Sequence, residues 1–433
     1  MRNVPFYEAF RFWLKLGFIS FGGPAGQIAI MHHELVERRR WISEGRFLHA
    51  LNYCMLLPGP EAQQLAIYIG WLLHRTRGGL VAGLLFILPS FVILVALSWL
   101  YATYGTVPAI AAFFSGMKPA VVAIVAFAAW RIGTRVLRSA WLAAIAVLAF
   151  VALAVFAVPF PAIVAVAALA GLAGSRLAPR SFQAAEPASP GDALIDEHSL
   201  TPEHATFSWG RLAWVLAAGV ALWLAAMAPL VALEGGHGTL SHMAAFFSKA
   251  ALVTFGGAYA VLPYVNQAAV EQHGWLTAPQ MIDGLALGET TPGPLIMVVT
   301  FVGYIGAWTH AATMAMPPWL AGIAGATVVT FFTFLPSFVF IFAGGPLVEA
   351  TRGRRLFTAP LAAVTAAVVG VITNLALYFA RHVFWPAGFA GSTDWMSLAI
   401  ACGAVLALSW FRLGVIPVIL ACGLAGLIAH GAG

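Results

Sequence analysis

Long apolar segments recur along almost the whole chain, and they limit its fold more than any other feature. They lie at 80–100, 120–130, 141–158, 162–177, 214–233, 398–410 and 415–429. Most approach the roughly 20 residues that a helix needs to cross about 30 Å of hydrocarbon, and none alternates like a membrane β-strand. With 61% hydrophobic and 9% charged residues and a mean hydropathy of +0.90, the chain is too apolar for a soluble domain. We therefore expect an all-α polytopic membrane protein.

A polar segment at 178–208, rich in Pro, Ser and acidic residues, interrupts this pattern and is typical of a soluble linker. It divides the chain into an N-terminal repeat at 1–177, the linker, a connecting transmembrane helix at 209–233 and a C-terminal repeat at 234–433. The first residues lack an apolar core followed by a cleavage site, so we expect no removable signal peptide.

The two parts repeat each other in sequence. Lys15, Phe21-Gly22-Gly23, Trp41 and Pro58-Gly59-Pro60 recur as Lys249, Phe255-Gly256-Gly257, Trp275 and Pro292-Gly293-Pro294, at a constant offset of 234 positions (249 − 15). Leu88-Pro89-Ser90-Phe91 recurs as Leu335-Pro336-Ser337-Phe338 at an offset of 247 (335 − 88), which requires 13 extra residues (247 − 234) near 308–318. Internal duplication of this kind is typical of secondary transporters.

Positive charge predicts that the two repeats have opposite orientations. Arg75 and Arg77 precede the first helix that carries Leu-Pro-Ser-Phe, whereas Arg352, Arg354 and Arg355 follow the second. Because Lys and Arg mark cytoplasmic ends, the two copies are inverted and the linker is cytoplasmic. The same rule places Arg131, Arg135, Arg138, Arg176, Arg180 and Arg412 inside, and it leaves Arg381 and His382 outside as an exception.

Four Gly- and Pro-containing breaks interrupt the apolar segments and are the candidate substrate site. They are Phe21-Gly22-Gly23-Pro24, Pro58-Gly59-Pro60, Phe255-Gly256-Gly257 and Thr290-Thr291-Pro292-Gly293-Pro294. In the second half Ala258 occupies the position that corresponds to Pro24. The segments 47–57 and 62–73 are each too short to span, which predicts a re-entrant hairpin. In inverted-repeat transporters such broken helices lie at the midplane around the substrate.

A helix that begins at such a break presents backbone N–H groups and a partial positive charge, which favours an anion. Lys15 and Lys249 each precede a Phe-Gly-Gly break within an apolar segment. A lysine in the membrane is costly unless it meets an acid or an anion, so we interpret both as substrate-binding. The alternative is that they extend to the membrane interface along their apolar stems.

Two acidic residues flank the Pro-Gly-Pro turns without matching each other. Glu61 follows the first turn, and Glu289 precedes the second beside Thr290 and Thr291. Either can carry a coupling proton, although Glu61 also suits the first turn of a helix, where an acid is favourable. Asp283 and Asn52 are weaker candidates. His32 and His33 lie beside Arg38, Arg39 and Arg40, which indicates a helix end, so we expect no metal site and no cofactor.

In these motifs the chain resembles the chromate ion transporter family in its long, two-domain form. The resemblance covers about 6–177 and 240–431 and depends on the order and repetition of Phe-Gly-Gly-Pro and Pro-Gly-Pro. It implies export of chromate, a sulfate-like dianion, across a bacterial inner membrane, driven by the membrane potential or a proton gradient. The residues alone indicate a small oxyanion.

Other functions are less consistent with the sequence. His33-Glu34-Leu35-Val36-Glu37 lacks the second histidine of a zinc-protease motif, and no Gly-x-Ser-x-Gly is present, so an enzyme is not expected. Sulfate uptake or exchange and a passive anion channel remain alternatives. The net charge of +6 is scattered, which does not indicate a nucleic-acid partner. Small residues such as Gly79 and Gly83 allow close packing within one chain or between two copies, so a homodimer is possible.

Overall fold

The computed structural model describes residues 4–21, 23–177, 203–234, 236, 238–255, 258–350, 358–389 and 391–431, and every regular element in them is helical. The first part contains α1 (Phe6–Ile19), α2 (Gly23–His32), a π-helix (His33–Arg38), α3 (Glu44–Cys54), α4 (Glu61–Tyr104), α5 (Pro108–Val136), α6 (Ala140–Ala154) and α7 (Phe160–Leu177). A short 3-10 turn (Glu203–Ala205) precedes α8 (Trp209–Glu234). The second part contains α9 (Thr239–Val253), α10 (Ala258–Asn266), a π-helix (Gln267–Gln272), α11 (Ala278–Thr290), a 3-10 turn (Leu295–Met297), α12 (Val298–Thr309), α13 (Pro318–Ala350), α14 (Thr358–Phe384), α15 (Trp395–Ser409) and α16 (Val415–Gly431).

The repeat found in the sequence extends to the local structure. The two π-helices, His33–Arg38 and Gln267–Gln272, have the same length of 6 residues and are related by the same offset as the motifs (267 − 33 = 234). Because π-helical turns are rare, their recurrence at matched positions is strong evidence for two related halves.

Helix α4 is a hairpin of two helical segments rather than one straight helix. Its backbone leaves the helical region at His74 (φ −138°, ψ 33°) and Arg75 (φ 54°, ψ −154°), so the segment 61–73 folds back on 77–104. The two segments approach at glycine: a Cβ on Gly70 would lie 2.5 Å from the carbonyl oxygen of Gly78. The sequence predicts a short helical segment at 62–73. Its close packing against the segment 77–104 is an additional finding.

The second half forms the same hairpin from two separate helices. A Cβ on Gly303 of α12 would lie 2.5 Å from the carbonyl oxygen of Gly325 of α13, which repeats the contact in α4. The longer connection at 310–317 lies within the region where the sequence predicts the extra residues.

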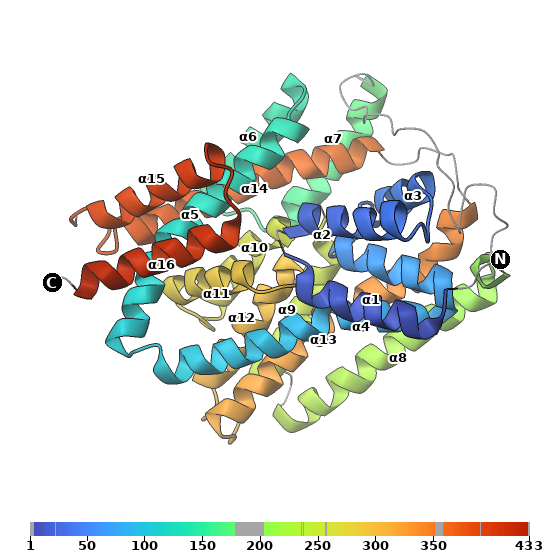
Figure 1. Cartoon of the computed structure of the whole chain (residues 1–433), viewed down its shortest axis with the longest axis horizontal. Coiled ribbons are helices and arrows are strands. Elements are labelled where there is room, and N and C mark those ends of the chain that lie inside the picture. The colour runs from blue at the N-terminus through green and yellow to red at the C-terminus, as the bar shows by residue number, and fades with distance from the viewer. Residues whose placement is uncertain are drawn as a thin grey trace.

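The helices form two groups (Figure 1). One group, which we call the peripheral bundle, consists of α5, α6, α7, α14, α15 and α16, and α14 packs against α5, α6 and α7. The other, the central block, contains α1 to α4 and α9 to α13, with α4 packed on α1, α12 and α13. The predicted connecting helix is α8, which runs along the margin of the central block. Both groups combine elements from the two halves.

Within the described residues, five segments are long and apolar enough to cross a membrane: Glu61–Tyr104, Pro108–Val136, Trp209–Glu234, Pro318–Leu347 and Ala359–Phe384. In α8 only 6% of the most apolar window is buried within the protein, so its side chains have little but lipid to contact. Gly79 and Gly83 face the rings of Phe342 and Phe338 of α13, so these small residues allow close packing within the chain.

Most of the predicted linker, 178–202, lies outside the described residues. Its last residues contact the central block: His204 Nε2 lies 3.0 Å from the carbonyl oxygen of Trp71, and the Trp71 and His204 rings meet edge to face. Arg211 of α8 donates to the carbonyl oxygen of Thr206 at 3.0 Å. The end of the linker is therefore attached to the first arm of α4.

Candidate functional site

The breaks of the two halves meet in the interior through a pair of reciprocal hydrogen bonds. The Gly59 N–H donates to the carbonyl oxygen of Thr254 at 2.8 Å, and the Gly293 N–H donates to that of Ser20 at 2.7 Å. Ser20 and Thr254 are the residues just before the two Phe-Gly-Gly motifs. Each Pro-Gly-Pro turn is thus bound to the other half, at equivalent positions.

This arrangement requires glycine at the centre of each turn. Gly59 and Gly293 have φ of 119° and 103°, a region that side chains rarely enter. A Cβ on Gly59 would lie 2.7 Å from the Ser337 hydroxyl oxygen, and one on Gly293 would lie 2.7 Å from the Ser90 Cβ. The serine of each Leu-Pro-Ser-Phe motif therefore packs against the Pro-Gly-Pro turn of the opposite half.

Two glutamines bind the carbonyl groups of the turns. Gln27 Nε2 lies 2.5 Å from the carbonyl oxygen of Gly293, and Gln64 Nε2 lies 2.7 Å from that of Pro58. Both side chains are fully buried. A carboxamide carries a donor and an acceptor on one rotatable group, so these residues can exchange the group that they present to a ligand.

Several buried polar atoms near the turns have no hydrogen-bond partner among the described residues. They are the hydroxyls of Ser20 and Ser90, the Oε1 atoms of Gln27 and Gln64, Oε2 of Glu61, and both amide atoms of Gln63. Buried polar atoms are normally paired, so an unpaired group here indicates a position for a polar ligand or water. We call Ser20, Gln27, Gly59, Glu61, Gln63, Gln64, Ser90, Thr254, Gly293 and Ser337 the central polar cluster.

The two acidic residues flanking the turns are both buried. Glu61 is the first residue of α4 and is 6% exposed. Glu289, 9% exposed, accepts a hydrogen bond of 2.6 Å from the Tyr259 hydroxyl at the start of α10. Its neighbours Thr290 and Thr291 use their hydroxyls on carbonyl groups of α11, at 3.0 Å to Leu287 and 3.1 Å to Gly288. The two hydroxyls therefore complete the end of α11.

The two predicted lysines lie at the surface of the protein, whereas the polar groups beside the turns are buried. Lys15 and Lys249 are both exposed, and Lys15 Nζ lies 4.0 Å from Glu34. Burial raises the pKa of Glu34, but hydrogen bonds from Arg38 and Arg39 and the charges of Arg38 and Lys15 outweigh it, so the pKa lies below its usual value. Lys15 thus belongs to an ionic cluster at the end of α1, because the apolar face of this helix lies on its other side.

The remaining predicted residues are only partly described. Gly23 and Pro24 begin α2, Phe21 lies just before it and Phe255 lies just after α9, whereas Gly22, Gly256 and Gly257 lie outside the described residues. Pro58, Pro60, Pro292 and Pro294 flank the two glycines of the turns. Asn52 is exposed.

The histidines pair with acids: His33 Nδ1 lies 2.7 Å from Glu37 and His32 Nδ1 lies 3.2 Å from it. Within the described part of the chain, no group of three His, Cys, Asp or Glu is arranged to hold a metal.

The glutamines are not among the site residues predicted from the sequence. Gln63 and Gln64 form an amide pair just after Pro-Gly-Pro, in a segment that is otherwise apolar. This pair is the signal that points to them, because unpaired amides are as costly in lipid as other polar groups. Gln27 shows a similar signal four residues after Gly23.

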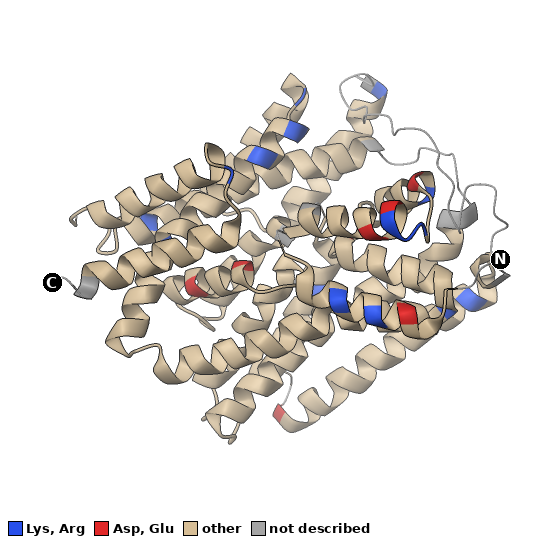
Figure 2. Cartoon of the chain, in the orientation of Figure 1, with Lys and Arg blue, Asp and Glu red and all other residues tan. Residues whose placement is uncertain are grey.

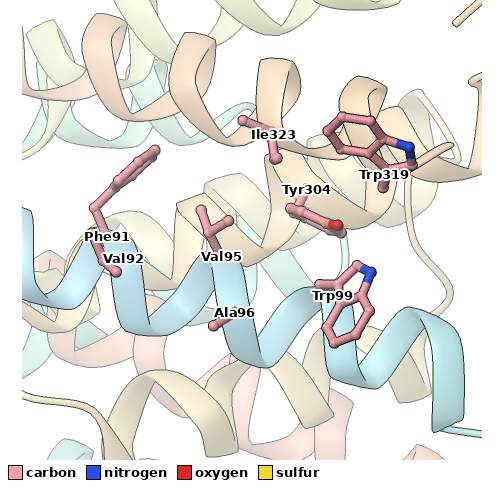
Figure 3. A pocket seen from close by; sticks show the side chains of 8 residues that line it. All are labelled: Phe91, Val92, Val95, Ala96, Trp99, Tyr304, Trp319 and Ile323. Atoms are coloured by element: carbon pink, nitrogen blue, oxygen red, sulfur yellow. The ribbon is translucent and has the colours of Figure 1, made fainter. Parts of the chain in front are cut away.

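An apolar groove of about 440 Å³ lies between α4, α12 and α13 (Figure 3). Its lining consists of Phe91, Val92, Val95, Ala96, Trp99, Tyr304, Trp319 and Ile323. Trp99 and Trp319 lie at one end, as tryptophans do near a membrane interface. A surface of this composition cannot replace the hydration of an anion, so the central polar cluster is the better candidate site.

Comparison with known proteins agrees with these features. The sequence pattern of the family described as "Chromate transporter" matches residues 7–172 and 241–427. The chain is 36% identical to a chromate transport protein of Pseudomonas aeruginosa over 97% of its own length and 91% of the relative. It is 28% identical to that of Cupriavidus metallidurans, over 86% of this chain and 82% of the relative.

A third relative, a probable chromate transport protein of Synechococcus elongatus, is 26% identical over 86% of this chain and 84% of the relative. No solved structure matches the chain. The two matched segments cover both halves and all four breaks. The chain therefore belongs to the chromate transporter family and is a multi-pass membrane transporter rather than an enzyme.

Proposed function

We propose that this protein exports chromate across the bacterial inner membrane and that the central polar cluster binds the dianion between two inverted halves. The observation that carries the proposal is the pair of reciprocal contacts, Gly59 with Thr254 and Gly293 with Ser20, surrounded by unpaired buried polar groups. A site built from matched elements of two halves suits alternating access, since each half can release the turn of the other.

The family and the chemistry of the cluster together support an oxyanion. Chromate is named for the relatives described above, and amides and hydroxyls replace the water around a tetrahedral anion through hydrogen bonds. In this structure the N–H groups of Gly59 and Gly293 donate to carbonyl groups of the other half. Binding therefore requires the anion to displace these carbonyls or to use the free amide of Gln63.

The membrane potential favours export over uptake. Moving one charge through 100 mV changes its free energy by about 2.3 kcal/mol, so a dianion leaving a negative interior gains about 4.6 kcal/mol. Glu61 and Glu289, buried beside the turns, are the proposed carriers of a coupled proton. Protonating a carboxyl group next to an arriving dianion lowers the repulsion between them.

Lys15 and Lys249 are proposed to attract the anion toward the site. Both ammonium groups are exposed, and positive charge at an entrance raises the local concentration of an anion. The breaks at 21–24, 58–60, 255–257 and 290–294 form the proposed walls of the site. The tight contacts between them favour a transporter over an open channel.

Replacing Gln63 with leucine separates binding from stability. Both amide atoms of Gln63 are buried without a partner in the described residues, so an apolar side chain of similar size leaves the free energy of unfolding equal or higher. Chromate accumulation by everted vesicles is expected to fall at least about tenfold, the effect of losing one hydrogen bond to a charged ligand.

Ser98→Ala is the matched control, because the Ser98 hydroxyl is also buried and unpaired but lies in α4 far along the chain from the turns. This variant is expected to transport normally. Unchanged chromate accumulation by a folded Gln63→Leu variant would contradict the proposed site. Equilibration without accumulation by the wild type would instead indicate a channel, and preference for labelled sulfate over chromate would favour the sulfate alternative.

A further inference from the structure

A polar cavity of about 210 Å³ lies between the ends of α5, α11, α14 and α15, and none of the turn residues lines it. We call it the vestibule. Its lining consists of Ser115, Lys118, Pro279, Ile282, His382, Val383, Pro386, Asp394 and Ser397. It is large enough for a tetrahedral oxyanion, and its lining contains hydroxyl, ammonium and imidazole groups.

Lys118 is the group that gives the vestibule its chemistry. It is one of three lysines in the sequence, the other two being Lys15 and Lys249. Its Nζ lies 3.6 Å from Oδ2 of Asp283, and 25% of its side chain remains exposed. The ammonium therefore lies between a buried carboxylate on one side and the open vestibule on the other.

Asp283 is held more deeply than its partner. Its side chain is 4% exposed, and Oδ2 also accepts a hydrogen bond of 2.9 Å from the Tyr101 hydroxyl. The other carboxylate oxygen, Oδ1, has no hydrogen-bond partner within the described residues. A carboxylate with one unpaired oxygen binds its lysine less strongly than a carboxylate that uses both oxygens. A ligand with a larger negative charge can therefore compete with Asp283 for the ammonium group.

The carboxylate and the imidazole that line the vestibule already have hydrogen-bond partners. Asp394 caps α15, accepting from the Ser397 N–H at 2.9 Å and from the Ser397 hydroxyl at 2.7 Å. His382 Nδ1 donates to the carbonyl oxygen of Tyr378 at 2.8 Å. The Asp394 carboxylate is turned to its own helix, so it competes less for Lys118 than Asp283 does.

We propose that the vestibule is a second oxyanion site, at which an arriving chromate or sulfate displaces Asp283 from Lys118. This assignment rests on the transport function proposed above and adds a second anion-binding site to the transport path. By the distribution of arginine, the α5 end near Lys118 is opposite to the end that carries Arg131 and Arg135. The vestibule is therefore the release side for export.

Helix α11 connects the vestibule to the central polar cluster. Asp283 and Glu289 lie on this helix six residues apart, which corresponds to about 9 Å along its axis. Glu289 is adjacent to the turn that contains Gly293. An anion leaving the turns can thus move along one helix from the first site to the second.

The test compares variants of Lys118 and Asp283 in proteoliposomes, with chromate supplied separately to each face. Lys118→Gln is expected to raise the half-saturating chromate concentration at the vestibule face about tenfold, which corresponds to one lost charge-assisted hydrogen bond. The value at the opposite face stays within about twofold, a difference of less than half a kcal/mol. Asp283→Asn frees the ammonium and lowers the value at the vestibule face.

Opposite effects of the two single variants on the half-saturating concentration distinguish an anion site from an ion pair that only stabilises the fold. If the pair only stabilises the fold, both single variants lose activity. The double variant, Lys118→Gln with Asp283→Asn, then recovers activity because neither charge is left unpaired. Under our proposal the double variant keeps the weak binding of Lys118→Gln, and Lys118→Arg restores much of the wild-type affinity.

Arg176→Gln, which removes an exposed positive charge at the end of α7, is the control for net charge and is expected to behave like the wild type. Wild-type flux with unchanged half-saturation in folded Lys118→Gln overturns the vestibule site and leaves the central polar cluster intact. Absence of chromate flux in the wild type overturns the transport function itself, so the two failures are distinguishable.

Discussion

Glycine at positions 59 and 293 is required both for backbone conformation and for space. Their φ values of 119° and 103° are unfavourable for any residue with a Cβ, and a Cβ would also press on Ser337 or Ser90. We expect Gly59→Ala and Gly293→Ala to lower the free energy of unfolding by about 1–3 kcal/mol each. Thermal unfolding in detergent and chromate flux in vesicles measure the two effects.

Gly403→Ala provides the matched control for these variants. Gly403 lies in α15, and a Cβ there would have no heavy atom within 4 Å. Alanine is the better helix former, so this variant is expected to be as stable as the wild type or slightly more stable. If the two turn variants matched Gly403→Ala in both stability and flux, the turns would have no special role.

The sequence predicted the residues of the breaks better than the directions of nearby side chains. Lys15 shares an exposed face of α1 with Arg11 and Leu14, while Phe12 and Trp13 are buried. The spacing of the apolar residues in α1 predicts that Lys15 lies on the exposed face of this helix. The recurrence of the lysine in the second half indicated a binding role instead. The sequence signal for Gln63 is an amide group in an apolar segment, where a polar group needs a hydrogen-bond partner.

At the level of helices, the hairpin contacts should respond alike in the two halves. Gly70→Val and Gly303→Val each push a side chain against the backbone of the facing segment, at Gly78 and Gly325. We expect both to lower the melting temperature of the purified protein, at a cost of about 1–3 kcal/mol each. Gly403→Val, at an open position of α15, is expected to change it little. A large effect in one half alone would show that the two hairpins are not equivalent.

The helical class and the positions of several apolar helices could be predicted because hydropathy is a local property of the sequence. The predicted connecting helix, 209–233, is nearly the observed α8, Trp209–Glu234. The π-helices could not be predicted, since their turns depend on one extra residue between fixed ends. The sharp return at His74 and Arg75 was also hidden, because neither residue is a usual helix breaker.

For the molecule as a whole, the predicted inversion of the halves can be tested at two equivalent turns. Thr76 lies at the return within α4 and Thr313 in the connection between α12 and α13, and both are exposed. Figure 2 shows that the lower left edge of the protein carries no Lys or Arg, whereas most of them lie above and to the right. If the halves are inverted, this distribution predicts that Thr76 faces the cytoplasm and Thr313 the outside.

Cysteine labelling of intact cells measures this arrangement. In a background with the exposed Cys402 replaced by serine, Thr313→Cys is expected to react with an impermeant maleimide, and Thr76→Cys only with a permeant one. Equal reactivity of both cysteines toward the impermeant reagent would mean that the halves point the same way. The buried Cys54 and Cys422 should remain unlabelled in the folded protein.

How the halves pair could not be predicted from the sequence. The repeat indicates that two equivalent surfaces exist, but the partners of Gly59 and Gly293 lie 195 and 273 residues away in the chain (254 − 59, 293 − 20). Contacts of this kind depend on the packing of the whole molecule and leave no local pattern.

The exchange of turns between the halves makes each one incomplete by itself. A single half in isolation would leave a glycine amide and a carbonyl group buried in lipid without partners, at a cost of several kcal/mol. A gene for one half is therefore expected to yield a stable product only if two such products pair their turns with each other. Fusion into one polypeptide removes that need for association and frees each copy to acquire its own residues, such as Gln63 in one and Tyr259 in the other.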